Sequence, residues 1–482
     1  MKDYVGFYIF IKCRTNYSMS LVLNMIKRFI LVVGLSFSTL AFSYDSSVEG
    51  GASLTYTDNA GFSSDRREED LISSLTGRYL FRGESSYARL LTSLGATYDH
   101  YLGNTFTDHL NLDGVVQLAG VISPKQLEWV VENLTADTFD NPTRFSRSGD
   151  GSRLNVFSTG PTLMSVINPE NTFLLNLRHS IINDEDDVDS VRKKAEGIYE
   201  HQFSEVAGFR FVTLGEQVEF DEDEQVFLGT MTDFNRYEAF INPYRNGNNS
   251  RIEFELGTTQ IERQTDKEKD TYPRWAFLAS HSIENTRDIS LSLSQRFSDS
   301  IDDLVTASTG IANSSFGQSS SQASVTNSVG GVQQSASTLL IDDSSNAVVE
   351  EKNAALAFSF YGNVVDFYPT VYVNRRLTSE LFTPGTGDRL RRGADFLFGR
   401  RLNARTDAAL GVFISKSIFD NQAVDVEYLQ GYVARISYLL APRVEFSSEL
   451  SRDVRREVAS SISEEHAEEH RLMFSVYYLP KF

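Results

Sequence analysis

Apolar and polar residues alternate with a period of two in segment after segment of this chain. In residues 287–298, isoleucine and leucine at odd positions oppose serine at even positions, and similar alternation fills 250–263, 442–455 and 469–482. Period two is the signature of a β-strand whose two faces meet different surroundings. The content of 21 Tyr and 34 Phe with only 10 Pro also favours strands.

The connections between these segments are short and long in turn. Short polar connections lie at 82–86, 123–126, 168–171, 246–250, 284–287, 362–365 and 440–443. Longer ones lie at 59–70, 141–152, 183–190, 264–270, 299–350, 378–388 and 456–469. This alternation is typical of an antiparallel barrel in a bacterial outer membrane, with tight periplasmic turns and long external loops.

The predicted fold is therefore all-β, a transmembrane antiparallel up-and-down β-barrel of about 20 strands, between 18 and 22. The strand count is given as a range because the number of strands within residues 221–245 and 299–350 is ambiguous. The strands are expected at 47–58, 71–82, 86–101, 106–122, 126–139, 154–168, 171–183, 191–204, 206–220, 232–245, 250–263, 272–284, 287–298, 351–362, 364–377, 389–402, 404–418, 426–440, 442–455 and 469–482.

The N-terminal region carries an export signal. Residues 25–43 have a basic start, an apolar run and small residues at the cleavage positions, which is the layout of a secretory signal peptide. Residues 1–24 are then an over-extended N-terminus, and 44–482 form the barrel. The Ser/Gln/Asn/Gly-rich segment 299–350 is predicted to be a long external loop. The alternatives are a constriction folded into the lumen and a hidden pair of strands.

Charge and cysteine content exclude several classes of function. The single cysteine, Cys13, precedes the signal peptide, so the mature chain has no disulfides, cysteine-ligated metals or thiol catalysis. The formal net charge of -20 argues against nucleic acid as a partner. The partners expected for such a barrel are outer-membrane lipid, lipopolysaccharide and the barrel-assembly machinery, and its location is the outer membrane.

The C-terminal stretch "HRLMFSVYYLPKF" predicts the closing strand of the barrel. Its alternate residues would point into lipid, and the aromatic end would serve as an assembly signal. The residues assigned to this signal are Phe474, Val476, Tyr478 and Phe482.

The opposite parity of the strands predicts a polar, water-filled lumen. Charges of both signs occur there, and burying them without partners or water would cost several kcal/mol each. The predicted lumen-lining residues are Arg178, Arg251, Glu253, Glu255, Arg296, Asp366, Tyr368, Tyr372, Arg376, Arg443, Glu445 and Glu449. Tyr368 and Tyr372 would either offer stacking platforms for sugar rings or simply fill space in the wall.

Two clusters invite a search for metal chemistry. His466 and His470 stand four residues apart among glutamates, as zinc ligands do on a helix, but a solvated charged loop is the favoured interpretation. The acidic run 184–190 lacks the glycine of a calcium loop and is interpreted as a solvated tip. Nucleophile elbows, Walker loops and dinucleotide fingerprints do not occur in the sequence. Neither an enzyme, nor a metal site, nor a cofactor is predicted.

The stretch from Ala52 to Ser64, above all Tyr56-Thr57-Asp58-Asn59, resembles the opening strand and first loop of a bacterial family of porin-like outer-membrane β-barrels. These barrels are encoded beside exopolysaccharide synthesis and exosortase (PEP-CTERM) genes. The stretch "GPTLMS" at 160–165 is also similar. The resemblance implies a barrel that takes part in exopolysaccharide export, with polysaccharide and periplasmic export proteins as partners and no catalytic residues.

Three functional hypotheses follow. The chain is a channel component that passes exopolysaccharide across the outer membrane, or a general or solute-selective porin, or a non-conducting barrel that serves as a structural or surface-interaction element. The resemblance favours the first hypothesis, and the polar lumen allows either of the first two.

Overall fold

The computed structural model describes residues 43–61, 67–139, 151–184, 189–221, 233–283, 286–299, 348–362, 364–378, 389–419, 426–458 and 465–478. These residues form twenty β-strands. The strands are β1 (Ser43–Thr57), β2 (Asp70–Glu84), β3 (Ala88–Tyr101), β4 (His109–Ser123), β5 (Leu127–Phe139), β6 (Gly151–Asn168), β7 (Asn171–Asp184), β8 (Ser190–Ser204), β9 (Ala207–Phe220), β10 (Phe234–Asn246), β11 (Ser250–Arg263), β12 (Lys269–Ile283), β13 (Arg287–Asp299), β14 (Val348–Tyr361), β15 (Val365–Thr378), β16 (Arg389–Asn403), β17 (Thr406–Phe419), β18 (Val426–Ala441), β19 (Val444–Val458) and β20 (Glu465–Tyr478). Among the described residues, no helix has the length and apolar character needed to cross a membrane.

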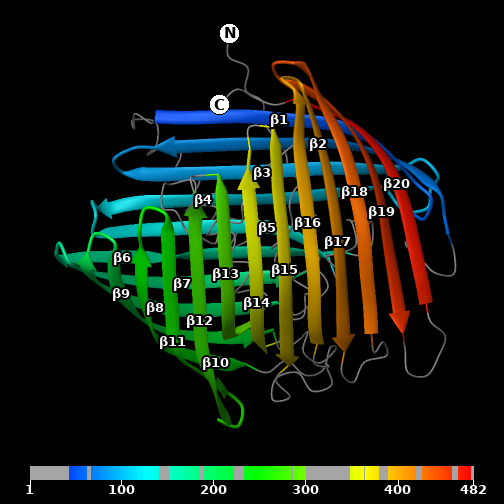
Figure 1. Ribbon diagram of the computed structural model, residues 1–482. Helices are drawn as coiled ribbons and strands as arrows, with labels where there is room; N and C mark the ends of the chain where they lie inside the picture. The colour runs from blue at the N-terminus through cyan, green and yellow to red at the C-terminus, as the bar shows by residue number, and fades with distance from the viewer. Residues whose placement is uncertain are drawn as a thin grey trace, which may run out of the picture.

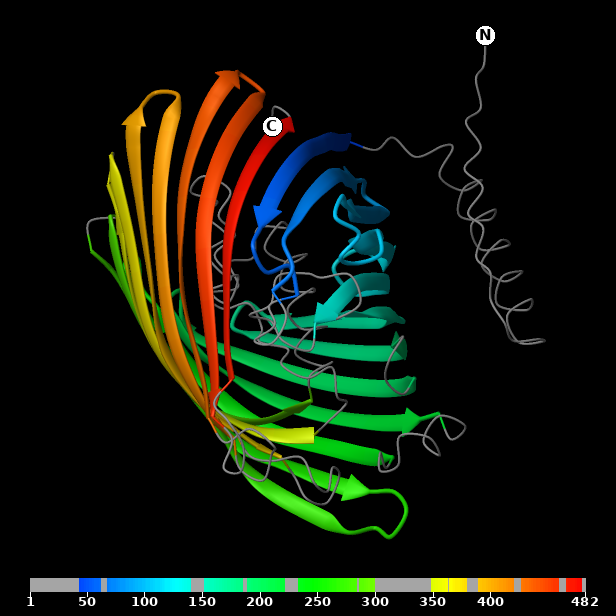
Figure 2. The same cartoon turned by 90° about the vertical axis from the view of Figure 1, so that its right-hand side faces the viewer.

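Every strand pairs antiparallel with its neighbours in sequence, and β1 pairs with β20. The sheet therefore closes on itself with an up-and-down topology. In Figure 1 the strands of one wall, β1 to β6, run across those of the opposite wall, β13 to β20, as strands tilted to a barrel axis do. Figure 2 shows β20 beside β1 where the barrel closes. The predicted fold class is confirmed.

All twenty predicted strands are present, with ends within four residues of those expected. Of the two ambiguous segments, 221–245 contributes β10, while 300–347 lies outside the described residues. The predicted loop at 456–469 is much shorter than expected, because β19 continues to Val458 and β20 begins at Glu465.

The connections distinguish the two ends of the barrel. At one end the strands are joined by two or three residues, as at 85–87 and 442–443; we call this the turn end. At the other end they are joined by five or more residues, as at 102–108 and 300–347; we call this the loop end. The start of β1 and the end of β20 both lie at the turn end.

Burial identifies the inner face of the closed sheet. On β10, Tyr237 and Ile241 are 46% and 42% exposed, whereas Arg236 and Glu238 are 2% and 6% exposed. Only the interior of a closed barrel can enclose a charged side chain, so the even positions of β10 face inward. Cross-strand partners share a face, which extends the assignment around the whole sheet.

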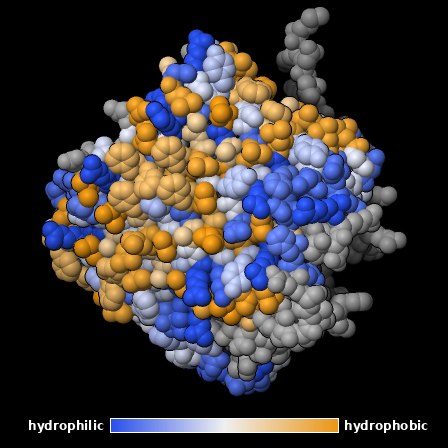
Figure 3. Space-filling model, turned by 45° about the vertical axis from the view of Figure 1, so that its right-hand side comes forward, coloured by the Kyte–Doolittle hydropathy of each residue, from blue (hydrophilic) through white to orange (hydrophobic). Residues whose placement is uncertain are grey.

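The outer face exposes many apolar side chains and carries aromatic side chains toward both ends. Near the turn end, Tyr199, His201, Phe203 and Phe209 form a cluster of rings with centroids 5.0 to 6.2 Å apart. Near the loop end, the exposed tyrosines are Tyr56, Tyr98, Tyr237 and Tyr428. The face in Figure 3 shows broad apolar areas between polar ones. Aromatic girdles that flank an apolar band are typical of barrels that cross a membrane.

The C-terminal strand presents Leu472, Phe474, Val476 and Tyr478 on this apolar face, each between 37% and 43% exposed. Phe482, the last member of the predicted assembly signal, lies outside the described residues.

Candidate functional site

A charged ladder crosses five strands of the inner wall, β8 to β12. We define it as Arg192, Glu216, Arg236, Glu238, Arg274 and Glu255. Arg236 Nη2 lies 2.8 Å from Glu216 Oε2, and its Nε lies 3.9 Å from Glu238 Oε1. Arg274 continues the ladder, with Nη1 2.7 Å from Glu238 Oε2 and Nη2 3.3 Å from Glu255 Oε2. Opposite charges thus alternate along the wall.

Most of the charged ladder is removed from solvent. Arg192, Glu216, Arg236 and Glu238 are between 2% and 6% exposed. Arg192 Nη1 lies 4.0 Å from Glu216 Oε1, and the Thr259 hydroxyl donates to Glu238 Oε1 at 3.2 Å. Burying each such charge without a partner would cost several kcal/mol of stability. The alternation of positive and negative side chains is therefore what allows them to be buried in this wall.

An apolar cluster lies on the loop-end side of the charged ladder. Val218, Phe220, Phe234 and Ile261 face inward and are at most 6% exposed, and they pack with Phe297. A smaller cluster at the loop end of β5 to β7 consists of Leu154, Val156 and Ile182, with Leu134 against it. On these walls, apolar contacts lie near the loops and charges lie deeper in the barrel.

The opposite wall, β13 to β20, holds further inward ion pairs. Arg471 is paired with Asp453, and the Arg435 Nη2 donates to Glu445 Oε1 at 3.4 Å. Farther along, the Asn374 amide donates to Glu351 Oε1 at 2.7 Å, and Arg296 Nη2 lies 3.4 Å from Glu351 Oε2. Both signs therefore recur around the circumference.

The wall formed by β2 to β4 is more open. Arg78 Nη2 and Asp113 Oδ2 form an inward ion pair of 2.7 Å, and these side chains are 39% and 48% exposed. Solvent therefore reaches this part of the interior, in contrast to the charged ladder.

Several of the predicted lumen residues lie on the inner face of their strands, and most of these form polar contacts with other side chains. Among them are Arg251, Glu253, Glu255, Arg296, Tyr368, Glu445 and Glu449. Arg251 and Glu253 pair at 2.6 Å. Glu449 is partly buried on β19, and Tyr368 is 6% exposed on β15.

Arg178 serves the wall itself. Pro161 has no N–H, and the ladder between β6 and β7 skips residues 160–161. The Arg178 Nη1 donates to the carbonyls of Gly160, Pro161 and Leu177 at 2.9 to 3.4 Å, and its Nη2 donates to Thr162 Oγ1 at 2.8 Å. Its guanidinium therefore satisfies backbone groups that the interrupted ladder leaves unpaired.

Tyr372 lies flat against a glycine of the neighbouring strand. Its cross-strand partner is Gly393, and a Cβ at that glycine would meet the tyrosine hydroxyl at 2.5 Å. Tyr477 covers Gly51 in the same way where β20 meets β1. An aromatic ring over a glycine fills space in a sheet. Of the two roles considered for Tyr372, its position over Gly393 fits space filling.

Three predicted lumen residues lie at strand ends. Arg443 is part of the two-residue turn between β18 and β19, and its Nη1 donates to the hydroxyl of outward-facing Tyr478 at 3.2 Å; its assignment to the lumen was wrong. Asp366 accepts from the Gly362 N–H at 3.2 Å and so holds the turn before β15. Arg376 lies on β15, where its backbone partner on β16 is Arg389. Its side chain lies outside the described part of the structure.

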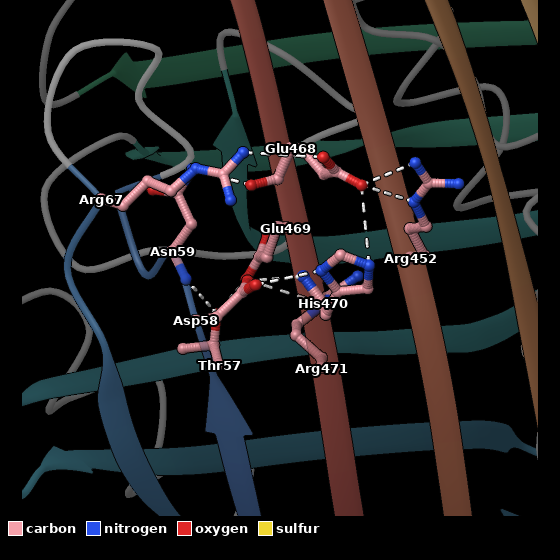
Figure 4. Close-up of polar contacts among 9 residues, drawn as sticks. All are labelled: Thr57, Asp58, Asn59, Arg67, Arg452, Glu468, Glu469, His470 and Arg471. Atoms are coloured by element: carbon pink, nitrogen blue, oxygen red, sulfur yellow. Dashed lines mark hydrogen bonds and ion pairs between the residues drawn. The ribbon is translucent and has the colours of Figure 1, made fainter.

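The closing seam is held by backbone pairing at the turn end and by side chains at the loop end. Gly50–Thr57 pairs with Arg471–Tyr478, where β1 ends. Beyond this point Asp58 Oδ1 accepts from the His470 N–H at 2.7 Å, and its Oδ2 lies 3.0 Å from the His470 Nδ1 (Figure 4). The Asn59 amide donates to the Glu468 carbonyl at 2.9 Å, and the Thr57 hydroxyl donates to Glu469 Oε1 at 2.7 Å.

These contacts give structural roles to two sequence features. Three residues of the Tyr56-Thr57-Asp58-Asn59 motif bind β20 through their side chains at the seam. His466 and His470 belong to β20 and not to a solvated loop, so that interpretation of the histidine cluster was wrong. The reason is that Arg452 Nε donates to Glu468 Oε1 at 2.6 Å, which gives the charged segment partners on β19 as well as on β1.

Of the charged ladder, only Glu255 was among the lumen residues predicted from the sequence. The other members also occupy inward-facing positions of predicted strands. Its members come from segments in which alternation is less clean, such as 190–204 and 207–220. Cross-strand registration would have aligned them, since Arg236 and Glu216 are direct partners. No group of histidine, cysteine or acidic side chains suited to hold a metal ion occurs among the described residues. Residues 185–188 of the acidic tip lie outside them.

Comparisons with known proteins give structural neighbours only. No protein-family model matches the chain, and no curated protein matches it. The FrpB iron transporter of Neisseria meningitidis aligns with a TM-score of 0.48 and 8% identity, over 90% of this chain and 81% of that one. The OccK2 protein of Pseudomonas aeruginosa aligns with a TM-score of 0.41 and 10% identity, over 90% of this chain and 98% of that one.

Proposed function

We propose that this protein is a channel-forming β-barrel of the bacterial outer membrane. The observation that carries the proposal is the opposite character of its two faces. Outward positions such as Ile252 and Leu256 are apolar and 48% exposed, while their inward neighbours Glu253 and Glu255 belong to ion pairs. A closed sheet of this kind suits lipid outside and water inside, because every strand finds a partner for its backbone amides.

The orientation follows from the strand count and the export signal. Twenty strands place both ends of the barrel chain at the turn end. A chain exported by the signal at 25–43 and inserted from the periplasm keeps its turn end there. The loop end then faces the outside of the cell.

Conduction is the direct test of the channel. Purified protein added to planar lipid bilayers should produce discrete current steps, and heat-unfolded protein should produce none. Arg78→Glu reverses a charge on the open wall, so it should shift the reversal potential in a salt gradient toward cation preference. The absence of steps at all voltages would contradict the proposal.

As a narrower function we propose the export of exopolysaccharide, which the resemblance of residues 52–64 supports. Deletion of the gene should then trap polymer in the periplasm and reduce it at the cell surface, and reintroduction of the gene should restore it. Unchanged surface polysaccharide in the deletion strain would contradict export but not conduction.

The second candidate is a porin for small solutes. The mixed signs of the inner wall favour it, because a wall with paired charges, such as Arg78 and Asp113, admits water without strong preference for one ion. Swelling of proteoliposomes in solutions of sugars of increasing size separates the two. A porin passes small sugars and leaves the surface polysaccharide of a deletion strain unchanged.

A further inference from the structure

A row of basic and aromatic residues crosses the outer face near the loop end of β16 to β20. Arg392 is the direct cross-strand partner of Lys416, Lys416 of Tyr428, Tyr428 of Arg456, and Arg456 of His466. Arg392, Tyr428, Arg456 and His466 are exposed, and Lys416 is half-buried. We call these five residues the basic row.

The like charges of the basic row destabilise the pairing of its strands when no anion is bound. Like charges placed directly opposite on neighbouring strands are destabilising, and Arg392 faces Lys416. The row has no acidic member, in a chain whose formal net charge is -20. An anion that binds across the strands would convert this repulsion into attraction.

Tyr428 lies between two cations and orders them. The Lys416 Nζ is 4.9 Å from the centroid of the Tyr428 ring, and the Arg456 guanidinium carbon is 6.0 Å from it. Cation–π contacts of this kind hold the two head groups on either side of the ring. The row therefore presents its positive charges on one line along the surface.

The basic row lies within an apolar surface. On its turn-end side are Ala394 and Ile414, and the next outward row contains Phe396 and Val412; Ile414 is 55% exposed. On its loop-end side is a last row of Leu390, Ile418, Val426 and Val458, all half-buried. A surface with charges set among exposed apolar residues fits an amphiphile better than a soluble anion.

Two acidic residues close to the basic row contact basic residues outside it. Glu468, two residues from His466, accepts from Arg452 at 2.6 Å and lies 3.5 Å from Arg67. Glu457, next to Arg456 in sequence, has the opposite parity and lies 3.1 Å from Arg455.

The height of the basic row matches a membrane interface. The end of β16 at Asn403 lies eleven residue steps after Arg392. At about 3.3 Å per residue and a tilt of about 40°, they rise roughly 28 Å along the barrel axis. The apolar band of such barrels is about 25 Å tall. The row therefore lies where the head groups of the leaflet at the loop end would be.

We propose that the basic row binds the phosphate groups of a phosphorylated glycolipid, of the lipid A type, whose acyl chains lie over Ile414, Val412 and Phe396. The inference rests on the membrane placement proposed above and goes beyond the channel function. The guanidinium groups of Arg392 and Arg456 supply paired N–H donors for phosphate oxygens, and the Lys416 ammonium supplies a point charge between them.

The test is a lipid titration of the purified, detergent-solubilised protein followed by native mass spectrometry. The probes are diphosphorylated lipid A, monophosphorylated lipid A, phosphatidylcholine and inorganic phosphate. The test variant is Arg392→Gln/Lys416→Gln. The matched control is Lys193→Gln/Lys352→Gln, which removes two outward basic residues of the loop end that already face carboxylates, Glu219 at 3.2 Å and Glu350 at 3.5 Å.

The wild-type protein should retain diphosphorylated lipid A more strongly than the other probes. The Arg392→Gln/Lys416→Gln variant should bind it about tenfold more weakly, and the control variant should bind it as the wild type does. Arg456→Gln alone should weaken binding about threefold, which decides the question if the double variant does not fold.

Equal affinity of the wild type and the test variants for lipid A would overturn the proposal. Displacement of lipid A by millimolar inorganic phosphate would also overturn it, in favour of a site for free phosphate. Single-channel current of the same preparations separates this inference from the proposed channel. Failed lipid binding with normal conductance removes only the lipid site, and silent bilayers with normal lipid binding remove only the channel.

Discussion

Replacement of Arg236 by methionine should destabilise the barrel more than any comparable change on the open wall. Methionine keeps most of the volume of the side chain but removes its charge. In the wild type the guanidinium lies 2.8 Å from Glu216 and 3.9 Å from Glu238, and all three residues are at most 6% exposed.

The magnitude follows from the burial of these charges. Loss of one partner of a buried ion pair costs about 3–5 kcal/mol, because the other charge stays buried without compensation. An exposed ion pair contributes only about 0–1 kcal/mol. Arg78→Met breaks the pair with Asp113, whose side chains are 39% and 48% exposed, and is therefore the matched control.

Guanidinium chloride unfolding of protein folded in lipid vesicles measures the difference. Trp275 on β12 lies next to Arg274 of the charged ladder and reports the transition by fluorescence. Arg236→Met should lower the free energy of unfolding by about 3–5 kcal/mol, and Arg78→Met should lower it by less than about 1 kcal/mol.

A second substitution examines the cause. Because Glu216 also lies 4.0 Å from Arg192, Glu216→Gln is measured alone and combined with Arg236→Met, and the loss in the double variant should be smaller than the sum of the two single losses. Equal stability of Arg236→Met and Arg78→Met, or losses that simply add in the double variant, would refute the reasoning about buried charge.

Three further predictions concern the wall, the seam and a loop. Gly393→Ala forces its tyrosine partner off the wall and should cost about 1–3 kcal/mol in the same unfolding assay, whereas Gly77→Ala, with no atom within 4 Å of the new Cβ, should cost less. Asp58→Ala removes two hydrogen bonds to His470 and should speed amide exchange at the loop end of β20 while the turn end of the seam stays protected. In the 102–108 loop, hydrogen bonds from a tyrosine hydroxyl and a histidine ring lower the pKa of Asp108 below its usual 3.8. The contribution of Asp108 to the stability of the loop is therefore present above pH 3.8 and lost as the pH falls through the lower folded-state pKa. Proton NMR of the loop as a function of pH measures this loss. A loop that loosens already above pH 3.8 would contradict the prediction.

The strands could be predicted because a barrel wall separates two solvents along its whole length. Every strand must then alternate, and a shift by one residue would place its apolar face in the lumen. This is why β11 was predicted with its observed ends, Ser250–Arg263. The glycine partners of Tyr372 and Tyr477 depend on registration between strands, which alternation within one strand does not reveal.

The start of β20 shows where local pattern fails. Residues 464–470 have the composition of a solvated loop, yet six of these seven residues belong to a strand. Their partners include Asp58, 412 residues away along the chain, and Arg452 on β19. The charged ladder was missed for the same reason, because the ion pair between Glu216 and Arg236 becomes visible only when two strands are registered.

The central claim is that lipid covers the outside of this barrel while its polar inner wall is shielded from lipid. Spin labels placed one at a time at positions 252 to 256 of β11, in protein reconstituted into lipid bilayers, test it most directly. The account predicts that labels at 252, 254 and 256 are relaxed by lipid-soluble oxygen, while labels at 253 and 255 are not. Equal oxygen access at all five positions, or strong access at 253 and 255, would contradict it.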